Sequence, residues 1–314
     1  MKKLLKFIII VVITVAVVDI GFGYFTRWYV DNHQLPGDYE TVDYLLKQST
    51  DDVIVIGSSV ALNSVNPLVI GDSINVTMWN GASNAQSMDY FDVMIKSIIP
   101  RYKPKLILLG LRFDESLTDS RGSRASFLIP YYKTGYVEID HFLEDVPVLE
   151  RQMLKSNLYR YNSLWLRILL NQFFKAGEKG ERGFIGKAVP PVLPDLIKST
   201  VNDEHSLSTT IGRFREILDY CRKESVPVCV FFPPQYMDFH GKRIVAHDEM
   251  LAACNKYGVK VYDSLYNSFW ISHPELFYDN RHLNVDGSTV FSSQLATFLK
   301  NEFFNDSIKP NNNL

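Results

Sequence analysis

The chain has 314 residues, of which 46% are hydrophobic and 22% charged, and 33 basic residues nearly balance 35 acidic ones. This length suffices for one large α/β domain with an insertion or for two domains, and the net charge of -2 provides no basic surface for nucleic acid. Three cysteines without a Cys-x-x-Cys spacing exclude a disulfide framework and the usual kind of zinc site. Cys221 and Cys229 lie in apolar helix and strand patterns. We therefore expect buried free thiols, with a single disulfide as the alternative.

The first apolar segment predicts a membrane anchor. Three lysines within the first six residues precede an apolar run from Phe7 to Phe25, which as a helix would span most of a hydrocarbon core at about 1.5 Å per residue. The lysines place the amino terminus in the cytoplasm and the rest of the chain outside it. No small-x-small motif follows the run, which favours an uncleaved anchor over a signal peptide.

One carboxylate interrupts this run. Asp19 is expected near the outer interface, where a charge costs little, and the alternative is a helix partner or a function inside the membrane. We predict an anchor at 1–28 and an extracytoplasmic domain at 29–314.

The first strand pattern ends in a glycine and two hydroxyls. Val53 to Ile56 is continuously apolar, which is typical of a strand buried on both faces of a parallel sheet. Gly57 permits a sharp turn, and Ser58 and Ser59 begin a helical pattern. The ordinary interpretation of either serine is a helix N-cap. The alternative is a reactive hydroxyl at the carboxyl end of a strand, where open α/β sheets bind their ligands.

The chain then alternates between strand and helix, which predicts a three-layer, flavodoxin-like α/β sandwich with a central parallel sheet. Further strands are expected at 74–79, 105–110, 226–232 and 259–262, and helices at 88–99, 211–223, 243–257 and 286–304. Between about 115 and 207 the alternation breaks. We expect a mainly helical insertion there, with a mobile loop at 177–183, that serves as a lid, a substrate groove or a surface for the membrane or a partner.

An aspartate and a histidine three residues apart, Asp279 and His282, stand just before the last helix. This spacing brings a carboxylate beside an imidazole, so that Asp279 can hold the ring tautomer whose other nitrogen is free to act as a base. Taken separately, Asp279 has an ordinary explanation as a turn or cap and His282 as a structural histidine. Together with Gly57-x-Ser59, the pair resembles the SGNH (GDSL-like) hydrolase family. The resemblance implies that Ser59 is the nucleophile, His282 the base and Asp279 its partner.

The same resemblance implies three donors to an oxyanion. They are the backbone N–H of Ser59, a backbone N–H in the loop after the second strand, from Gly81 or by spacing from Ala85, and an asparagine side chain after the third strand. This chain departs from the family at the third position, because Arg112 stands where the asparagine belongs. Arginine is a capable donor to a developing negative charge. The alternative for Arg112 is a surface ion pair with the acidic residues that follow it.

The implied chemistry is acyl transfer or ester hydrolysis through a covalent serine ester. With its single anchor, the chain is similar to bacterial proteins that work beside membrane-bound O-acyltransferases on alginate, cellulose or teichoic acids. The resemblance implies a polysaccharide or lipid-linked glycan substrate, a membrane-bound O-acyltransferase partner, and single-pass insertion in the bacterial cytoplasmic membrane. It implies neither a cofactor nor a nucleic-acid partner.

Two other functions stay open. One is a plain carbohydrate or lipid esterase, because the same residues serve water and sugar acceptors alike. The other is a non-catalytic binding or scaffold protein of the same fold, which the substitution at Arg112 favours. A metal site built on His273 is not expected, because no fourth ligand is evident in the sequence.

Overall fold

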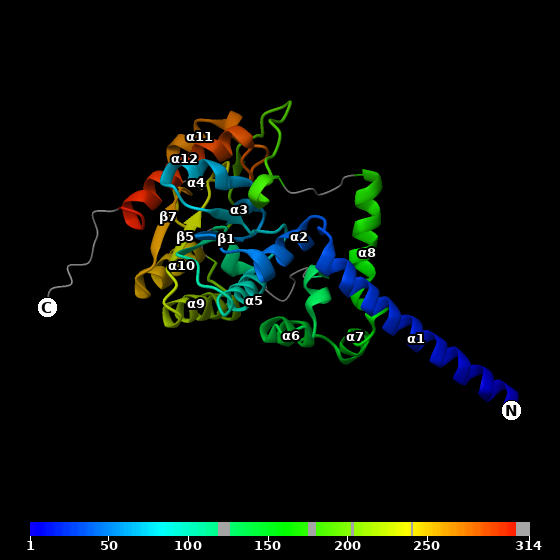
Figure 1. The fold of residues 1–314 in the computed structure, drawn as a ribbon. Coiled ribbons are helices and arrows are strands. Elements are labelled where there is room, and N and C mark those ends of the chain that lie inside the picture. Colours follow the sequence, from blue (N-terminus) through cyan, green and yellow to red (C-terminus); the bar gives the residue numbers. More distant parts are fainter. Residues whose placement is uncertain (119–125, 175–179, 202–203, 240, 306–314) are drawn as a thin grey trace. The chain divides into compact units, whose positions relative to one another are not determined.

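The structure, a computed structural model, describes residues 1–118, 126–174, 180–201, 204–239 and 241–305. The chain forms two compact units, residues 1–48 with 125–178, and residues 49–124 with 179–314 (Figure 1). The second unit contains the sheet and the first contains the long N-terminal helix. The division into an anchor at 1–28 and a domain at 29–314 stays a prediction. The first three residues of the loop predicted at 177–183 lie outside the described residues, and 181–183 form the short 3₁₀ helix η5 (Glu181–Gly183).

Five parallel strands form the central sheet of the second unit in the order β2-β1-β3-β5-β7. The strands are β1 (Val53–Gly57), β2 (Met78–Asn80), β3 (Leu106–Gly110), β5 (Val228–Phe232) and β7 (Lys260–Asp263). In chain order this is the 2-1-3-4-5 arrangement of flavodoxin-like sheets, so the predicted fold class is confirmed. A separate pair joins β4 (Ile197–Lys198) to β6 (Met237–Asp238).

Helices cover both faces of this sheet, which makes three layers (Figure 1). One layer contains α3 (Ser59–Ser64), α4 (Pro67–Ile74), α11 (Ser268–Ile271) and α12 (Val285–Glu302). The other contains α5 (Met88–Ile98), α9 (Ser208–Lys223) and α10 (Val245–Lys256). Every residue of β1, β3 and β5 is buried, because both faces of these strands are covered. Val53 and Val55, for example, share a core with Phe291 and Leu295 of α12.

The second strand is shorter than predicted. The pattern at 74–79 predicts a strand, but Ile74 ends α4 and only Met78 begins β2. Three local signals account for the helix. The side chain of Asn66 accepts a hydrogen bond from the N–H of Leu68, Pro67 occupies the first turn, and Asn75 ends the helix in a left-handed conformation with φ 55°.

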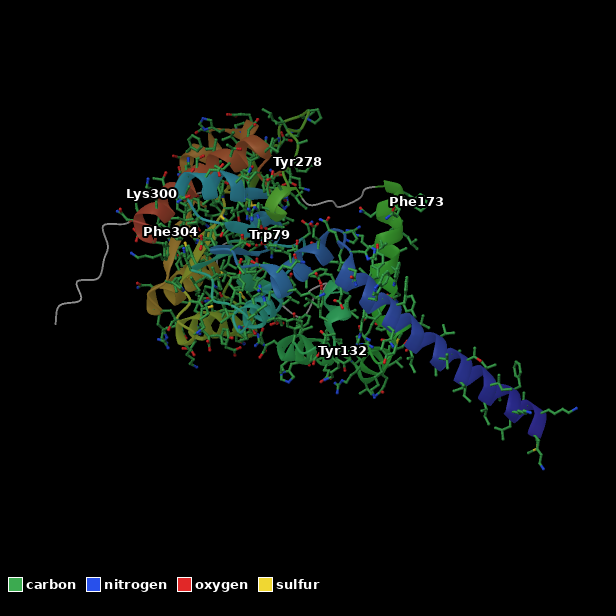
Figure 2. The ribbon with its side chains drawn as sticks, viewed as in Figure 1. Trp79, Tyr132, Phe173, Tyr278, Lys300 and Phe304 are labelled. Carbon is green, nitrogen blue, oxygen red and sulfur yellow. The ribbon has the colours of Figure 1, made fainter. Side chains whose placement is uncertain are left out.

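The first unit is helical. It contains α1 (Lys2–Asn32), α2 (Asp38–Asp43), η1 (Tyr44–Gln48), η4 (Ser126–Tyr131), α6 (Val137–Glu144), α7 (Val148–Met153) and α8 (Asn157–Phe174). Helix α1 is long and apolar enough to cross a membrane. Its N-terminal half projects its side chains away from the rest of this unit (Figure 2). The part of the predicted insertion that belongs to this unit is helical, as expected.

Candidate active site

Ser59 is the first residue of α3, and only Ser58 separates it from the end of β1. Two glycines let this helix lie on the strand ends. Gly57 and Gly110 are paired across β1 and β3, and a Cβ atom on either would come within 2.6 Å of the Cβ of Ala61 in α3. Because α3 packs this closely, Ser59 is held half-buried at the carboxyl edge of the sheet. This edge, where strand order reverses around β1, is where flavodoxin-like sheets bind their ligands.

The two serines have different surroundings. Ser58 occupies the N-cap position of α3, but its side chain makes no capping hydrogen bond. Its hydroxyl is buried and has no hydrogen-bond partner among the described residues. The interpretation of its side chain as an N-cap is therefore wrong. The Ser59 hydroxyl instead faces a histidine from the other end of the chain.

Ser59, His282 and Asp279 form a continuous hydrogen-bonded chain. The Ser59 Oγ lies 2.8 Å from His282 Nε2, and His282 Nδ1 lies 2.9 Å from both Asp279 Oδ1 and Asp279 Oδ2. A carboxylate only accepts hydrogen bonds, so Asp279 keeps the ring proton on Nδ1 and Nε2 accepts from the Ser59 hydroxyl. The His282 side chain is 20% exposed and that of Asp279 45%, so the group is open to solvent on one side.

A tight hairpin presents Asp279 and His282. Phe277 and Leu283 form an antiparallel bridge, and the N–H of Tyr278 donates to the carbonyl of His282 over 2.8 Å. Asp279 Oδ1 also accepts the backbone N–H groups of Arg281 and His282, at 2.8 and 2.9 Å. The turn interpretation of Asp279 is therefore correct as well, and one carboxylate both shapes the hairpin and orients the ring.

The hydrogen bonds determine the charge of Asp279. Partial burial on its own would raise the pKa of this carboxyl group. The hydrogen bond from the His282 ring and the backbone N–H groups of Arg281 and His282 outweigh burial, and the pKa lies below its usual value. Asp279 is therefore a carboxylate at neutral pH, as a partner for a histidine base requires.

Two asparagines that the sequence analysis did not single out hold this hairpin. Asn284 is fully buried; its side chain donates to the carbonyl of Glu275 at 2.7 Å and accepts from the N–H of Gly287 at 3.0 Å. It therefore caps α12 and ties that helix to the hairpin. The carbonyl of Asn280 accepts the N–H of Tyr236, beyond the end of β5. Asparagine immediately before a helical pattern is an N-cap signal that could have identified Asn284.

The loop after β2 contains both candidate backbone donors. The N–H of Gly81 donates to the carbonyl of Val55 over 2.9 Å, which extends the sheet and engages this group. Ala85 is exposed and has φ 55°, and its N–H makes no hydrogen bond within the described parts of the chain. Buried Asn80 holds the loop by donating to the carbonyl of Val65 at 2.8 Å and accepting from the N–H of Ala82 at 3.1 Å. Of the two alternatives, Ala85 has the available donor.

Arg112 lies just beyond β3 and contacts acidic neighbours. Its Nε is 3.3 Å from Asp114 Oδ1 and 3.4 Å from Glu115 Oε2, and its Nη2 donates to the hydroxyl of Thr118 at 2.9 Å. Burial raises the pKa of Glu115, and the charge of Arg112 offsets part of that rise. None of the contacts described for Arg112 joins it to Ser59 or His282. These contacts match the ion-pair alternative.

The second part of the insertion lies against this site. The Asn63 side chain of α3 donates to the carbonyl of Ile185 at 2.8 Å, and the N–H of Val285, at the start of α12, donates to the carbonyl of Lys187 at 2.9 Å. The ammonium group of Lys187 lies 5.3 Å from the ring centre of Tyr278. Residues 185–187 therefore connect the helix that carries Ser59 to the helix that follows His282. The exposed apolar residues that follow are Val189, Val192, Leu193, Leu196 and Ile197.

Other reactive groups have structural surroundings. His273 donates from Nδ1 to the carbonyl of Phe269, and its ring stacks on Phe269. No cluster of three or more potential metal ligands occurs among the described residues. All three cysteines are free and buried, and burial raises the pKa of Cys221 to about 12.

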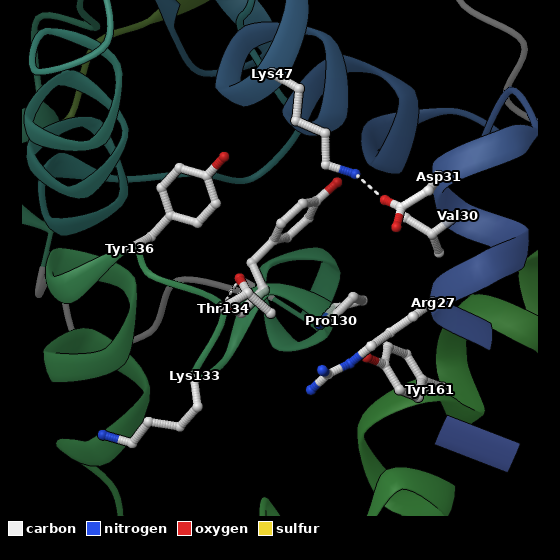
Figure 3. A pocket seen from close by; sticks show the side chains of 10 residues that line it. Arg27, Val30, Asp31, Lys47, Pro130, Lys133, Thr134, Tyr136 and Tyr161 are labelled. Carbon is white, nitrogen blue, oxygen red and sulfur yellow. Dashed lines mark hydrogen bonds and ion pairs between the residues drawn. The ribbon is translucent and has the colours of Figure 1, made fainter. Parts of the chain in front are cut away.

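The first unit contains a separate pocket of about 470 Å³ beside the C-terminal part of α1 (Figure 3). Arg27, Asp31, Lys47 and Tyr131 are among the residues that line it, and Lys47 forms ion pairs with Asp31 and Asp43. The lining includes no serine, cysteine or histidine. We therefore assign no ester chemistry to this pocket.

The sequence matches no protein-family model and none of the curated proteins. Among solved structures, it is similar to a protein of the G-D-S-L lipolytic family from Desulfitobacterium hafniense DCB-2, with 8% identity and a TM-score of 0.40, covering 78% of this chain and 97% of that one. It is also similar to the lipase/acylhydrolase from Enterococcus faecalis, with 9% identity and a TM-score of 0.39, covering 79% and 95% of the two chains. Because both TM-scores are low, functional assignment depends on the geometry of Ser59, His282 and Asp279.

Proposed function

We propose that the second unit catalyses ester chemistry through a covalent acyl-Ser59 intermediate. The observation that supports this proposal is the 2.8 Å contact between Ser59 Oγ and His282 Nε2, with the other ring nitrogen held by Asp279. A hydroxyl, a base within hydrogen-bond distance and a third group that orients the base are the parts that nucleophilic catalysis requires.

In the first half of the reaction, Ser59 Oγ attacks the ester carbonyl while its proton passes to His282 Nε2. The bond between the carbonyl carbon and the leaving alkoxide then breaks, and the alcohol departs with the proton from Nε2. In the second half, His282 removes a proton from water or from an acceptor alcohol, whose oxygen attacks the acyl carbon. The bond between that carbon and Ser59 Oγ then breaks, and the proton on Nε2 returns to Ser59 Oγ. Asp279 stabilises the charged imidazolium in both halves.

In this proposal, two backbone N–H groups donate hydrogen bonds to the developing oxyanion. Ser59 is the first residue of α3, and the first N–H groups of a helix have no partner within that helix. The N–H of Ala85 is the second donor, because that of Gly81 is engaged with Val55. Arg112 is assigned instead to the buried charge of Glu115. Such donors act by stabilising the transition state, and each is worth about 2.7–4 kcal/mol where it has been removed from other enzymes.

The proposed acceptor is a polysaccharide or lipid-linked glycan outside the cytoplasm, and the proposed acyl donor is delivered by a membrane-bound O-acyltransferase. Helix α1, which is long enough to anchor the chain to a membrane, supports this assignment. The resemblance at Ser59, Asp279 and His282 also supports it. In this proposal the N-terminus lies in the cytoplasm, as the lysines before the apolar run predict. The second unit then lies on the outer side of the membrane, which by the resemblance is the bacterial cytoplasmic membrane.

A plain esterase uses the same residues with water as the acceptor. A non-catalytic scaffold is the third candidate, supported by the departure at Arg112. The reactivity of Ser59 separates the scaffold from the two enzymes.

The test is reaction with a fluorophosphonate probe, which phosphonylates a serine that is activated by a neighbouring base. We expect the wild-type chain to be labelled at Ser59 and the Ser59→Ala variant to remain unlabelled. Ser58→Ala is the matched control, because it removes the adjacent hydroxyl, which has no described hydrogen bond; this variant should label like the wild type. An unlabelled wild-type chain, or equal labelling of Ser59→Ala, would contradict the proposal and favour the scaffold.

A further inference from the structure

The charges along α1 define the length of its apolar part. From Phe7 to Thr26, between Lys6 and Arg27, Asp19 is the sole charged residue. These twenty residues measure about 30 Å as a helix, which is the thickness of a hydrocarbon core. If Lys6 and Arg27 mark its two boundaries, Asp19 lies eight positions, or about 12 Å, inside the outer boundary. A carboxylate at this depth requires partners.

The partners of Asp19 come from the start of α8. Asp19 Oδ1 accepts from Ser156 Oγ at 2.6 Å and from the N–H of Leu158 at 2.9 Å. Asp19 Oδ2 accepts from the N–H and from the Nδ2 of Asn157, both at 3.1 Å. The Asp19 carboxylate therefore caps the N-terminus of α8, where the helix dipole also favours a negative charge. The helix-partner explanation of Asp19 applies within the chain itself.

From this point α8 runs alongside α1 toward its C-terminal end. Trp165 donates from Nε1 to the Thr26 hydroxyl at 2.8 Å, and its ring stacks on Phe25 with centres 5.6 Å apart. Figure 1 shows α8 beside the C-terminal half of α1. Since Asn157 contacts Asp19 and Trp165 contacts Thr26, the start of α8 is its deepest part in any membrane that α1 crosses.

The residues just before and at this deepest point expose apolar side chains. None of the six residues of α7 is buried. Val148 and Leu149 are 69% and 75% exposed, and Met153 and Leu158 are 43% and 40% exposed. We propose that residues 148–158, comprising α7 and the start of α8, insert into the acyl chains of the outer membrane leaflet beside α1.

The charged residues of this segment are consistent with a shallow position. Glu150, Arg151 and Lys155 are exposed, and the long side chains of Arg151 and Lys155 can extend to the headgroups while their stems remain among the acyl chains. Helices that lie in the interface bury their apolar faces by about 5–10 Å, slightly less than the depth of about 12 Å inferred for Asp19. The exposed apolar side chains of 148–158 are proposed to contact lipid. The bilayer that contains α1 extends to the depth of Asp19, and Asp19 is hydrogen-bonded to residues 156–158. This inference requires α1 to span the membrane and does not depend on Ser59.

The test uses the full chain in nanodiscs of phosphatidylcholine with brominated acyl chains, which quench only nearby fluorophores. Three single variants, Val12→Cys, Leu149→Cys and Val192→Cys, are labelled with a small thiol-reactive fluorophore; the native cysteines are buried. Val12 reports on the span. Val192, which is 79% exposed and belongs to the second unit, is the matched control for Leu149. We expect strong loss of fluorescence at Val12 and Leu149 and little at Val192.

Two results would overturn the inference. If Val12 is quenched but Leu149 no more than Val192, residues 148–158 are not in the leaflet. If Val12 is not quenched, α1 does not span the bilayer and the inference fails at its first step. Fluorophosphonate labelling of the same three samples is measured separately, so neither result is confused with a failure of the proposed ester chemistry.

Discussion

At the scale of single residues, the orientation of one imidazole determines whether Ser59 can react. Both oxygens of Asp279 face His282 Nδ1, and Oδ1 also accepts two backbone N–H groups of the hairpin. An asparagine at this position would keep its oxygen on the backbone N–H groups and direct its NH₂ at Nδ1. The ring proton would then move to Nε2, which could no longer accept the proton of Ser59.

Asp279→Asn is therefore expected to lower ester turnover by about 10³–10⁴-fold while changing the melting temperature little. Because the pKa of Asp279 lies below its usual value, its contribution to stability is complete above the unfolded value of about 3.9 and is lost only as the pH falls through the lower folded value. Between pH 5 and 8 its ionisation should add no limb to the turnover profile. Turnover within tenfold of the wild type would contradict this role.

Two roles can be tested for Arg112: the ion-pair partner of buried Glu115, or a hydrogen-bond donor to the oxyanion. Glu115 is 1% exposed, and Arg112 is its cation partner. Arg112→Gln should lower the free energy of unfolding by about 3–5 kcal/mol, because it leaves a buried charge unpaired. The loss should be smaller at pH 5 than at pH 8, because burial raises the pKa of Glu115 and the acid is then more easily protonated.

The control for Arg112 is the double variant Arg112→Gln/Glu115→Gln, which removes both charges. Denaturant unfolding should show most of the stability restored, and fluorophosphonate labelling should proceed at close to the wild-type rate. A double variant that is stable but labels about 10²–10³-fold more slowly would return Arg112 to the oxyanion hole.

The candidate site residues that could be singled out from the sequence lie in short, local patterns. Ser59 follows a buried strand and a glycine, and Asp279 and His282 are three residues apart, so each is visible in a window of a few residues. Asn80 escaped prediction because its side chain bonds backbone groups, and a single sequence does not show which carbonyl groups an amide will reach. Asn284, in contrast, carries the N-cap signal of an asparagine before a helical pattern. The sequence shows that Arg112 stands where the resemblance expects an asparagine. Its contacts with Asp114 and Glu115 could be identified only from the structure.

At the scale of elements, continuous apolar runs gave the central strands, because β1, β3 and β5 are covered on both faces. The second strand was placed too early, since Ile74 and Val76 are as suitable for a strand as for the end of a helix. The caps at Asn66 and Asn75 decided in favour of α4. Helix α3 can pack closely on the strand ends, and so position Ser59, only because Gly57 and Gly110 are paired across β1 and β3. This pairing joins strands that are distant in sequence, so it was not visible in the sequence.

At the scale of the whole molecule, the site joins residues 223 positions apart in the sequence. Strand order explains this, since Ser59 follows the strand at the switch point and His282 precedes the helix that packs on α3 and α4. Composition predicted the apolar N-terminal helix, but the contact of Asp19 with the start of α8 was not predictable, because the two segments are more than a hundred residues apart. The insertion was predicted as one region, and the structure divides it between the two units.

The central claim is tested most directly by trapping the intermediate. The full chain is mixed with an activated acetyl ester, quenched in acid within seconds and analysed by peptide mass spectrometry. We predict one acetyl group on Ser59 that is absent from Ser59→Ala, is lost over time in water, and is lost faster when an acceptor glycan is present if the chain is a transferase. A wild-type chain that turns over the ester but carries no acyl group on Ser59, or carries it equally on another residue, would contradict the account.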